Sequence, residues 1–331
     1  MADMAEFPYD RIWDMVIIGG GCAGLGCAIY ASRNQFETLV LEKKFVGGTL
    51  ALTYEVENYP GFFNPPISGM ELTQKFEEHA RYFGTKFHYA EAIKLENDGP
   101  YRLVHTNEGK VLRARTVTIA IGTEVNKLPA KNHDKFYGKG ISYCATCDAP
   151  FFKDKRVIVV GGGESAFEEA YYLTRFAREV YLVHRRQQFR ASPIAVERLR
   201  SAPNVEFILD TVVTEIHGNE QVEAVTLKNV KTKEERHFPT DGVFVFIGHH
   251  PRTEWLEGYL ELERGYIKVN YQQETSVPGV YAAGDICLGA EKQAVISAGH
   301  GATAAIKARN YVDGINWPDR VGKEAAVPRQ G

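Results

Sequence analysis

Short apolar runs that end in glycine recur along the chain and predict buried parallel strands. Met15–Ile18 runs into Gly19, and Val157–Val160 runs into Gly161. Continuous apolar runs without polar alternation are typical of strands covered on both faces of a parallel sheet. Each run precedes an Ala- and Tyr-rich stretch of helical period and then a second apolar run. The predicted helices are Leu25–Arg33 and Phe167–Arg175, and the predicted second strands are Thr38–Leu41 and Val180–Val183.

These two segments are copies of one βαβ unit, because they stay in register at an offset of 142 positions without a gap. Each carries a dinucleotide fingerprint, Gly19-x-Gly21-x-x-Gly24 in the first copy and Gly161-x-Gly163-x-x-Ala166 in the second. The glycines let the backbone approach a pyrophosphate, which the N-terminus of the next helix faces. One fingerprint alone also fits a glycine-tolerant turn in an unrelated fold. Two copies predict an α/β protein with two Rossmann-like domains for FAD or NAD(P).

Later apolar runs predict that the second domain is inserted into the first. Strand-like 116–121 ends at Gly122, 242–247 ends at Gly248, and 280–283 precedes Gly284 and Asp285, before a helix over 297–312. We therefore expect a first domain made of residues 1–124 and 251–331, with residues 125–250 as the second domain. The crossings at 123–126 and 249–252 can then serve as a hinge.

The residues that end the two second strands predict which nucleotide each copy binds. Glu42 ends the first and can accept hydrogen bonds from ribose hydroxyls, which favours FAD or NAD. The equivalent position of the second copy is His184, followed by Arg185, Arg186 and Arg190, whose guanidinium groups can clamp the 2′-phosphate of NADP. A solvated basic loop is the alternative there. Asp285 can bind a flavin's ribityl chain or can simply cap a helix.

Composition and charge restrict the class of protein. The chain has 331 residues, 44% hydrophobic and 24% charged, and a net charge of −3, so nothing predicts a nucleic-acid or anionic-lipid partner. It lacks an apolar run long enough for a membrane span, and its acidic start does not resemble a secretory signal. Five cysteines do not make a structural disulfide framework. We expect a cytoplasmic protein in a reducing compartment.

One cysteine pair, Cys144-Ala-Thr-Cys147, can carry chemistry. Such a pair can be half of a zinc site, a redox dithiol or an accident, and zinc needs further ligands that no second pair supplies here, so we expect no metal. Three-residue spacing on a helical turn suits a disulfide, and a helix that begins at the pair favours the thiolate of Cys144. Asp148 can pass protons to a thiolate or can be an ordinary acid at a helix start.

The chain resembles the low-molecular-weight NADPH-dependent thioredoxin reductases from about residue 14 to residue 315. The motifs are GGGCAG (19–24), TYEVENYPGF (53–62), CATCD (144–148), GGGESA (161–166), HRRQQFRAS (184–192) and AAGD (282–285). The resemblance implies FAD, NADPH, a homodimer, a redox-active Cys144–Cys147 disulfide and thioredoxin as the protein substrate. It implies that Cys144 attacks thioredoxin, that Cys147 faces the flavin and resolves the mixed disulfide, and that Asp148 is the general acid.

The same resemblance assigns cofactor contacts by position. The implied FAD contacts are Gly19, Gly21, Ala23, Gly24, Glu42, Gly48, Thr49, Asn58, Gly122, Gly284, Asp285, Lys292, Gln293 and Ala294; the implied NADPH contacts are Gly161, Gly163, Glu164, Ser165, His184, Arg185, Arg186 and Arg190. Three residues depart from the family's pattern, namely Thr49 where it has Gln, Lys292 where it has Arg, and Cys22 where it has Pro. These changes affect the expected flavin site and leave the Cys144–Cys147 pair and the NADP-binding arginines unchanged.

Hydride transfer requires the nicotinamide to lie next to the flavin, and disulfide reduction requires the Cys144–Cys147 disulfide to lie next to the same flavin. Both the nicotinamide and the disulfide are expected on the inserted domain. We therefore expect the domains to alternate between two arrangements about the crossings. Dithiol oxidases and ferredoxin-linked relatives are the alternative enzymes, and the paired arginines argue against both. A non-catalytic nucleotide sensor with a cysteine switch is the alternative of another class. Two histidines outside the motifs, His79 and His133, are expected on the surface.

Overall fold

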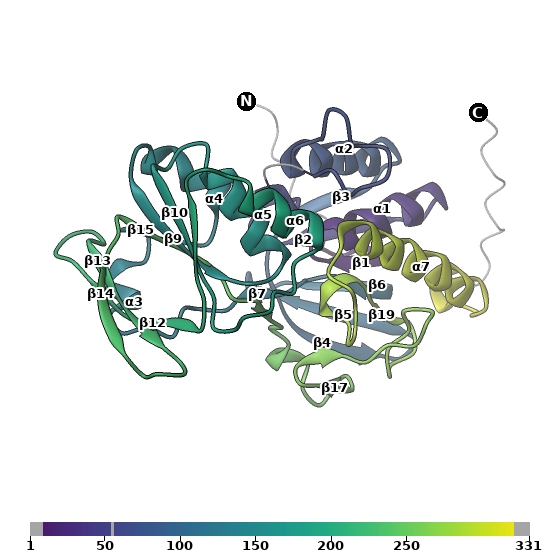
Figure 1. The fold of residues 1–331 in the computed structure, drawn as a ribbon. Helices are drawn as coiled ribbons and strands as arrows, with labels where there is room; N and C mark the ends of the chain where they lie inside the picture. Colours follow the sequence, from purple (N-terminus) through teal and green to yellow (C-terminus); the bar gives the residue numbers. More distant parts are fainter. Residues whose placement is uncertain (1–8, 54–55, 321–331) are drawn as a thin grey trace, which may run out of the picture. The chain divides into compact units, whose positions relative to one another are not determined.

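The structure is a computed structural model that describes residues 9–53 and 56–320, and its contacts divide the chain into two units (Figure 1). Unit 1 comprises the described residues up to 51, then 56–123 and 251 onward. Unit 2 comprises 124–250 together with Leu52 and Thr53. Of the motifs above, Tyr54 and Glu55 lie outside the described residues. No helix in the described part of the chain is both long and apolar enough to cross a membrane.

Unit 1 is built on a seven-stranded sheet with the order β3-β2-β1-β6-β5-β4. Its strands are β1 (Ile12–Ile18), β2 (Thr38–Glu42), β3 (Lys86–Tyr89), β4 (Ala92–Asp98), β5 (Tyr101–Thr106), β6 (Val111–Ile119) and β19 (Val280–Ala282). The strands β3, β2, β1 and β6 are parallel, whereas β5 and β4 continue as an antiparallel meander. The late strand β19 pairs in parallel with the second half of β6, so the chain returns to its first sheet after unit 2.

Helices cover one face of this sheet. The helices of unit 1 are α1 (Cys22–Arg33), α2 (Gly69–Tyr82) and α7 (Ala294–Asp313). Close approach of α1 to α7 depends on glycine, because a Cβ atom on Gly26 would lie 2.6 Å from the carbonyl oxygen of Ala298. Along β1, Met15 and Ile17 pack toward these helices, and Val16 and Ile18 pack with the residues of the meander. The short strands β17 (Leu262–Glu263) and β18 (Tyr266–Ile267) form a hairpin.

Unit 2 has a parallel five-stranded sheet with the order β11-β10-β9-β15-β8. The strands are β8 (Ile141–Ser142), β9 (Arg156–Gly161), β10 (Glu179–Val183), β11 (Val205–Ile208) and β15 (Gly242–Phe246). The helices α4 (Ala145–Asp148), α5 (Glu164–Leu173) and α6 (Pro193–Arg200) accompany it, and α3 (His133–Phe136) precedes it. An antiparallel sheet of β12 (Thr211–His217), β13 (Ala224–Asn229) and β14 (Glu235–Pro239) completes the unit.

The two faces of this parallel sheet have separate cores. Val157, Val159 and Leu182 pack with α5 and α6, whereas Ile158 and Val160 pack with apolar residues of the antiparallel sheet. Both faces are thus covered, as the unbroken apolar runs predict. The crossings also pair, because β7 (Glu124–Val125) and β16 (His249–His250) form a two-stranded antiparallel ribbon.

The predicted class of two Rossmann-like α/β domains is confirmed, and its details differ in one systematic way. Both fingerprint helices begin three residues earlier than predicted, at Cys22 and Glu164. The second glycine of each fingerprint, Gly21 and Gly163, is the N-cap, so the third small residue already lies inside the first turn. A separate prediction, that His133 lies on the surface, is wrong, because its ring is buried and contacts the hydroxyl of Tyr143 at 2.8 Å.

Candidate functional sites

The glycine turn of unit 1 has the geometry that a phosphate cradle needs. Gly19 has φ +105°, and a Cβ on Gly24 would lie 1.9 Å from the carbonyl oxygen of Gly19. These two glycines therefore serve the turn and the close packing of α1 on β1. A Cβ on Gly21 would meet nothing closer than the Cα of Gly48 at 4.0 Å. The space beside Gly21, at the N-terminus of α1, suits an anion.

Glu42 lies at the end of β2 and is held against this turn. Its carboxylate accepts hydrogen bonds from the backbone N–H of Gly20 at 2.7 Å and from that of Lys44 at 2.9 Å. The loop that follows also packs here, since the N–H of Gly47 donates to the carbonyl of Gly20 at 2.8 Å. Gly48 has φ +59°, and a Cβ atom on it would lie 3.2 Å from the Cα of Gly21. Thr49 is the next residue and is exposed.

Residues from three distant segments of unit 1 meet near the start of α7. Asn58 donates from Nδ2 to Oε1 of Gln293 at 3.2 Å across 235 positions of sequence. Asp285 accepts a hydrogen bond from the hydroxyl of Ser297 at 2.9 Å. Gly284, with φ +80°, brings this turn to α1, because its Cβ would lie 2.8 Å from the Cβ of Ala23.

The other residues assigned to the flavin are arranged as follows. Ala294 is the first residue of α7, directly after the N-cap Gln293. The ammonium nitrogen of Lys292 lies 3.4 Å from the hydroxyl of Tyr266. Among the described residues it forms no ion pair with a carboxylate. Gly122 has φ +61° with open space around it. The Asn58–Gln293 pair and the glycine turn are thus brought together by unit 1 alone, whereas Lys292 is engaged elsewhere.

The imidazole of His300 and the thiol of Cys22 lie close enough to Asp285 for its charge to affect their pKa values, and they indicate whether a flavin fits there. Nδ1 of His300 is buried and has no hydrogen-bond partner in the part of the chain that the structure describes. Burial lowers the pKa of His300, and the charge of Asp285 opposes this. Burial, with a smaller contribution from Asp285, raises the pKa of Cys22 to about 12, so this thiol is neutral. An open glycine cradle beside an unpartnered ring nitrogen fits a bound nucleotide with polar groups.

The glycine turn of unit 2 repeats the arrangement with a basic loop in place of the acid. A Cβ on Gly161 would lie 2.5 Å from the carbonyl oxygen of Phe246, whereas Gly163 has only the guanidinium of Arg190 nearby, at 4.0 Å. Arg185, Arg186 and Arg190 are exposed. Burial, together with the charges of these arginines, holds the pKa of His184 below its usual value. Ser165 is exposed in the first turn of α5.

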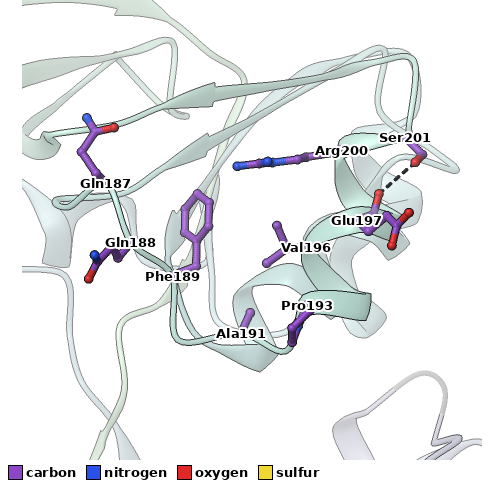
Figure 2. A pocket seen from close by; sticks show the side chains of 9 residues that line it. All are labelled: Gln187, Gln188, Phe189, Ala191, Pro193, Val196, Glu197, Arg200 and Ser201. Carbon is purple, nitrogen blue, oxygen red and sulfur yellow. Dashed lines mark hydrogen bonds between the residues drawn. The ribbon is translucent and has the colours of Figure 1, made fainter.

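A pocket of about 650 Å³ opens beside this loop (Figure 2). One wall is the loop itself, and the other is α6. Phe189 and Val196 point toward one another across it, and Arg200 extends over it. The lining residues are Gln187, Gln188, Phe189, Ala191, Pro193, Val196, Glu197, Arg200 and Ser201. The pocket combines apolar side chains with polar ones, and exposed arginines lie in the same loop, which suits a phosphorylated nucleoside.

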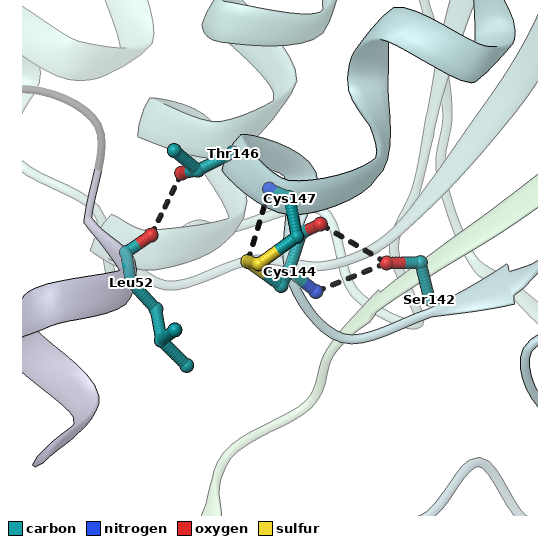
Figure 3. The surroundings of a disulfide bond; sticks show 5 residues. All are labelled: Leu52, Ser142, Cys144, Thr146 and Cys147. Atoms are coloured by element: carbon teal, nitrogen blue, oxygen red, sulfur yellow. Dashed lines mark hydrogen bonds between the residues drawn. A yellow bond between two sulfur atoms is a disulfide. The ribbon is translucent and has the colours of Figure 1, made fainter. Parts of the chain in front are cut away.

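The cysteine pair of unit 2 forms a disulfide at the start of α4 (Figure 3). The Cα atoms of Cys144 and Cys147 are 5.4 Å apart. Cys144 is the N-cap, and its sulfur accepts the N–H of Cys147 at 3.1 Å. Ser142 bonds both the N–H and the carbonyl of Cys144 at 3.1 Å, and Thr146 donates to the carbonyl of Leu52 at 2.7 Å. Cys147 is exposed and Cys144 half-buried, so the bond is accessible.

Two acidic groups adjoin the disulfide, and the sequence identified only one. Asp148, the expected acid, is half-buried at the end of α4. Glu169 of α5 faces the N–H groups of Ala145 and Thr146, between the two cysteines. Burial, and then the charge of Glu168, raise the pKa of Glu169 to about 7 although these N–H groups oppose the rise. Nothing in the sequence distinguishes Glu169 from Glu168, except that helical spacing places Glu169 on the same face as Ala166 and Leu173.

Comparisons with known proteins agree with this arrangement of two nucleotide folds and a reactive disulfide. The profile of the pyridine nucleotide-disulphide oxidoreductase family matches residues 13–306, so the chain belongs to that family and uses a flavin and a pyridine nucleotide. Within it the chain belongs to the thioredoxin reductases. It is 42% identical over 306 residues to the thioredoxin reductase of Bacillus subtilis, which covers 92% of this chain and 96% of that protein.

Solved structures place the chain in the same group. The thioredoxin reductase of Lactococcus lactis is 35% identical with a TM-score of 0.88, covering 92% of this chain and all of that one (100%). A ferredoxin-flavin thioredoxin reductase of Clostridium acetobutylicum is also 35% identical, with a TM-score of 0.51, and covers 92% of this chain and 99% of that one. The name of this Clostridium protein includes ferredoxin, whereas the names of the other two relatives give no electron donor.

Proposed function

We propose that this protein reduces thioredoxin with electrons from NADPH, which pass through FAD and the Cys144–Cys147 disulfide. The observation that carries the proposal is the accessible disulfide at the start of α4, in the unit whose glycine turn is bordered by arginines. Bound FAD would supply the chemistry of hydride acceptance from a nicotinamide and of two-electron transfer to a disulfide. The glycine turn of unit 1, Glu42 and the Asn58–Gln293 pair would hold it.

The donor is NADPH rather than NADH or ferredoxin because of the loop 184–190. Its three exposed arginines offer planar, permanently charged donors for a 2′-phosphate, which NADH lacks. A carboxylate at the same place, like Glu42 in unit 1, would repel that phosphate. A protein donor such as ferredoxin makes no use of a phosphate clamp, so these arginines favour NADPH over the donor named for the Clostridium relative.

The chemistry at sulfur follows from the local geometry. The N–H of Cys147 lies 3.1 Å from the sulfur of Cys144 and stabilises a thiolate there. Cys144 therefore attacks the thioredoxin disulfide and forms a mixed disulfide, releasing one thioredoxin thiolate. Cys147 then attacks Cys144, restores the internal disulfide and releases the second thiolate. Asp148 supplies a proton to a departing thiolate.

A protein substrate is supported by the surface next to the disulfide. Phe151 follows Cys147 by four residues and is 73% exposed. Exposed aromatic side chains beside a reactive group are typical of protein-binding surfaces. This apolar surface suits a folded partner such as thioredoxin better than a small soluble disulfide.

The proposed cycle also requires movement, because the nicotinamide and the disulfide belong to the same unit and each must reach the flavin. We propose that the two units alternate between two arrangements about the β7–β16 ribbon. Asn126 ties its strands, since its N–H donates to the carbonyl of Gly248 at 2.9 Å and its side chain contacts Nδ1 of His250 at 3.0 Å. A crosslink between the units should stop turnover, and unchanged turnover would reject alternation.

We propose further that the protein is a cytoplasmic homodimer. The apolar side chains of Tyr30 on α1, and of Val295 and Ile306 on α7, are exposed although these helices are otherwise well packed. Light scattering of the holoenzyme should give twice the chain mass, and a monomer would contradict the proposal. A reducing compartment suits three buried free thiols, Cys22, Cys27 and Cys287.

The test of the proposed activity compares donors and acceptors in one preparation. Under anaerobic conditions, NADPH should bleach the flavin absorbance, whereas NADH should do so only at much higher concentration. Turnover should follow with thioredoxin and with a small aromatic disulfide. Bleaching by NADH at equal concentration would refute the NADPH assignment, and failure of both nucleotides would favour a ferredoxin donor.

A further inference from the structure

The loop that carries the arginines is fastened to the glycine turn of unit 2 by one carboxylate. Glu164 is the first residue of α5, and Ser192 is the N-cap of α6. Oε2 of Glu164 accepts the backbone N–H of Ser192 at 2.6 Å, and Oε1 accepts its hydroxyl at 2.7 Å. The starts of two consecutive helices are therefore joined by a bidentate link.

Two more contacts hold the same loop at its other positions. The N–H of Arg190 donates to the carbonyl of Gly162 at 2.7 Å. The ring of His184 lies so close to Gly162 that a Cβ atom there would be 2.3 Å from the ring. Since His184 begins the loop and Ser192 ends it, both ends are attached to the glycine turn. The guanidinium groups between them start from a fixed backbone.

An acid at this position is unexpected in a phosphate site. A carboxylate in the first turn of α5 lies where the pyrophosphate is predicted to bind, and like charges repel. Here both carboxylate oxygens already accept strong, charge-assisted hydrogen bonds from Ser192. The carboxylate of Glu164 therefore binds Ser192 of the same chain, and we do not assign it a contact with the nucleotide.

We propose that Glu164 and Ser192 are positioning residues that set the preference for NADPH over NADH, by holding the arginine loop ready for the 2′-phosphate. This inference rests on the proposed use of NADPH. A loop ordered before binding does not lose its freedom on binding, so the affinity for the 2′-phosphate is higher. The link acts only through the loop and therefore does not contribute to binding of a nucleotide that lacks this phosphate.

The test measures 2′-phosphorylated and unphosphorylated ligands side by side. In Glu164→Gln one oxygen acceptor and the charge are lost, and in Ser192→Ala the hydroxyl donor is lost. We expect the KM for NADPH to rise about fivefold to twentyfold in each, with kcat and the KM for NADH changed by less than about twofold. Calorimetric titration of the holoenzyme with 2′,5′-ADP should show the same loss, and 5′-AMP should show none.

Matched variants separate positioning from simple loss of structure. Thr174→Val removes a hydroxyl at the other end of α5, where it donates to the carbonyl of Tyr171 at 2.6 Å, and it should leave both ligands unaffected. Glu164→Asp keeps the charge but shortens the reach, so it should resemble Glu164→Gln. The double variant Glu164→Gln/Ser192→Ala should lose little more than either single variant, because both changes break one link.

Three results would overturn the proposal. Equal weakening of NADPH and NADH in Glu164→Gln would mean that the carboxylate acts on the shared part of the nucleotide. Unchanged affinity for 2′,5′-ADP in both variants would mean that the link does not position the loop. Full activity of Glu164→Asp beside a defective Glu164→Gln would mean that charge alone matters. A wild-type enzyme without preference for NADPH would instead refute the proposed function, which distinguishes the two failures.

Discussion

Asn58 and Gln293 hydrogen-bond to each other, Nδ2 to Oε1 at 3.2 Å, although one precedes the inserted unit and the other follows it. Both were assigned to FAD by position, so the first prediction concerns the cofactor. Gln293→Ala should remove the hydrogen-bond partner of Asn58, so that the amide of Asn58 is no longer held in place. We expect this change to weaken FAD retention about tenfold. The measurement is the rise in free flavin fluorescence on dilution.

The control for this prediction is Gln272→Ala, which removes a half-buried amide of the same unit that donates to the hydroxyl of Tyr271 at 2.7 Å. It should release no flavin. Equal retention of FAD by Gln293→Ala and the wild type would show that the Asn58–Gln293 pair serves the protein fold alone.

A second prediction identifies the attacking sulfur. Because the N–H of Cys147 stabilises a thiolate on Cys144, the Cys147→Ser variant should form a lasting mixed disulfide with thioredoxin. Cys144→Ser should form much less. Non-reducing gels and mass spectrometry of the adduct give the result. If Cys144→Ser traps thioredoxin instead, the greater exposure of Cys147 decides which sulfur attacks, and the roles are reversed.

The sequence was sufficient for the parts of the fold in which local pattern and tertiary structure agree. The strands Met15–Ile18 and Val157–Val160 are apolar on both faces because both faces are covered, and their glycines are required by φ and by close packing. The places of Glu42 at the end of β2 and of the arginine loop after β10 could be predicted because they are one position in two copies of a repeat. Apolar runs and repeats of this kind can be recognised from a single amino-acid sequence, because they involve residues that are close together along the chain.

Other features depend on contacts between distant segments and leave no local signal. The meander of β4 and β5 and the antiparallel sheet β12–β14 have mixed polar and apolar residues that also suit loops. The link from Glu164 to Ser192 joins residues 28 positions apart, and only the return of the loop brings them together. Glu169 is one of two adjacent glutamates, and burial of one side chain rather than the other is decided by how α5 packs on α4.

A third prediction concerns the surface beside the disulfide. Phe151→Ala should raise the KM for thioredoxin about tenfold and leave turnover of a small aromatic disulfide unchanged, because only a protein partner covers the exposed ring. Phe63→Ala is the matched control, since Phe63 is 76% exposed but belongs to unit 1. Equal loss with both acceptors would instead place Phe151 in the structure of the reactive site.

The last prediction uses the raised pKa of Glu169. Burial lifts this pKa to about 7 from an ordinary value near 4.5, so the folded chain keeps a proton that the unfolded chain releases between these two pH values. Stability therefore decreases as the pH rises through that window, and above it the folded protein holds a buried charge. Glu169→Gln stays neutral and should be more stable than the wild type at about pH 8, by about 1–3 kcal/mol.

Urea unfolding at several pH values tests this difference. The two proteins should have similar stability at about pH 3, where Glu169 is protonated in both the folded and the unfolded state, and should separate progressively up to about pH 8. The exposed Glu220→Gln variant should follow the wild type throughout. A constant difference between Glu169→Gln and the wild type at every pH would show that the carboxyl does not titrate in this window, and that its place beneath the disulfide turn has no effect on proton binding.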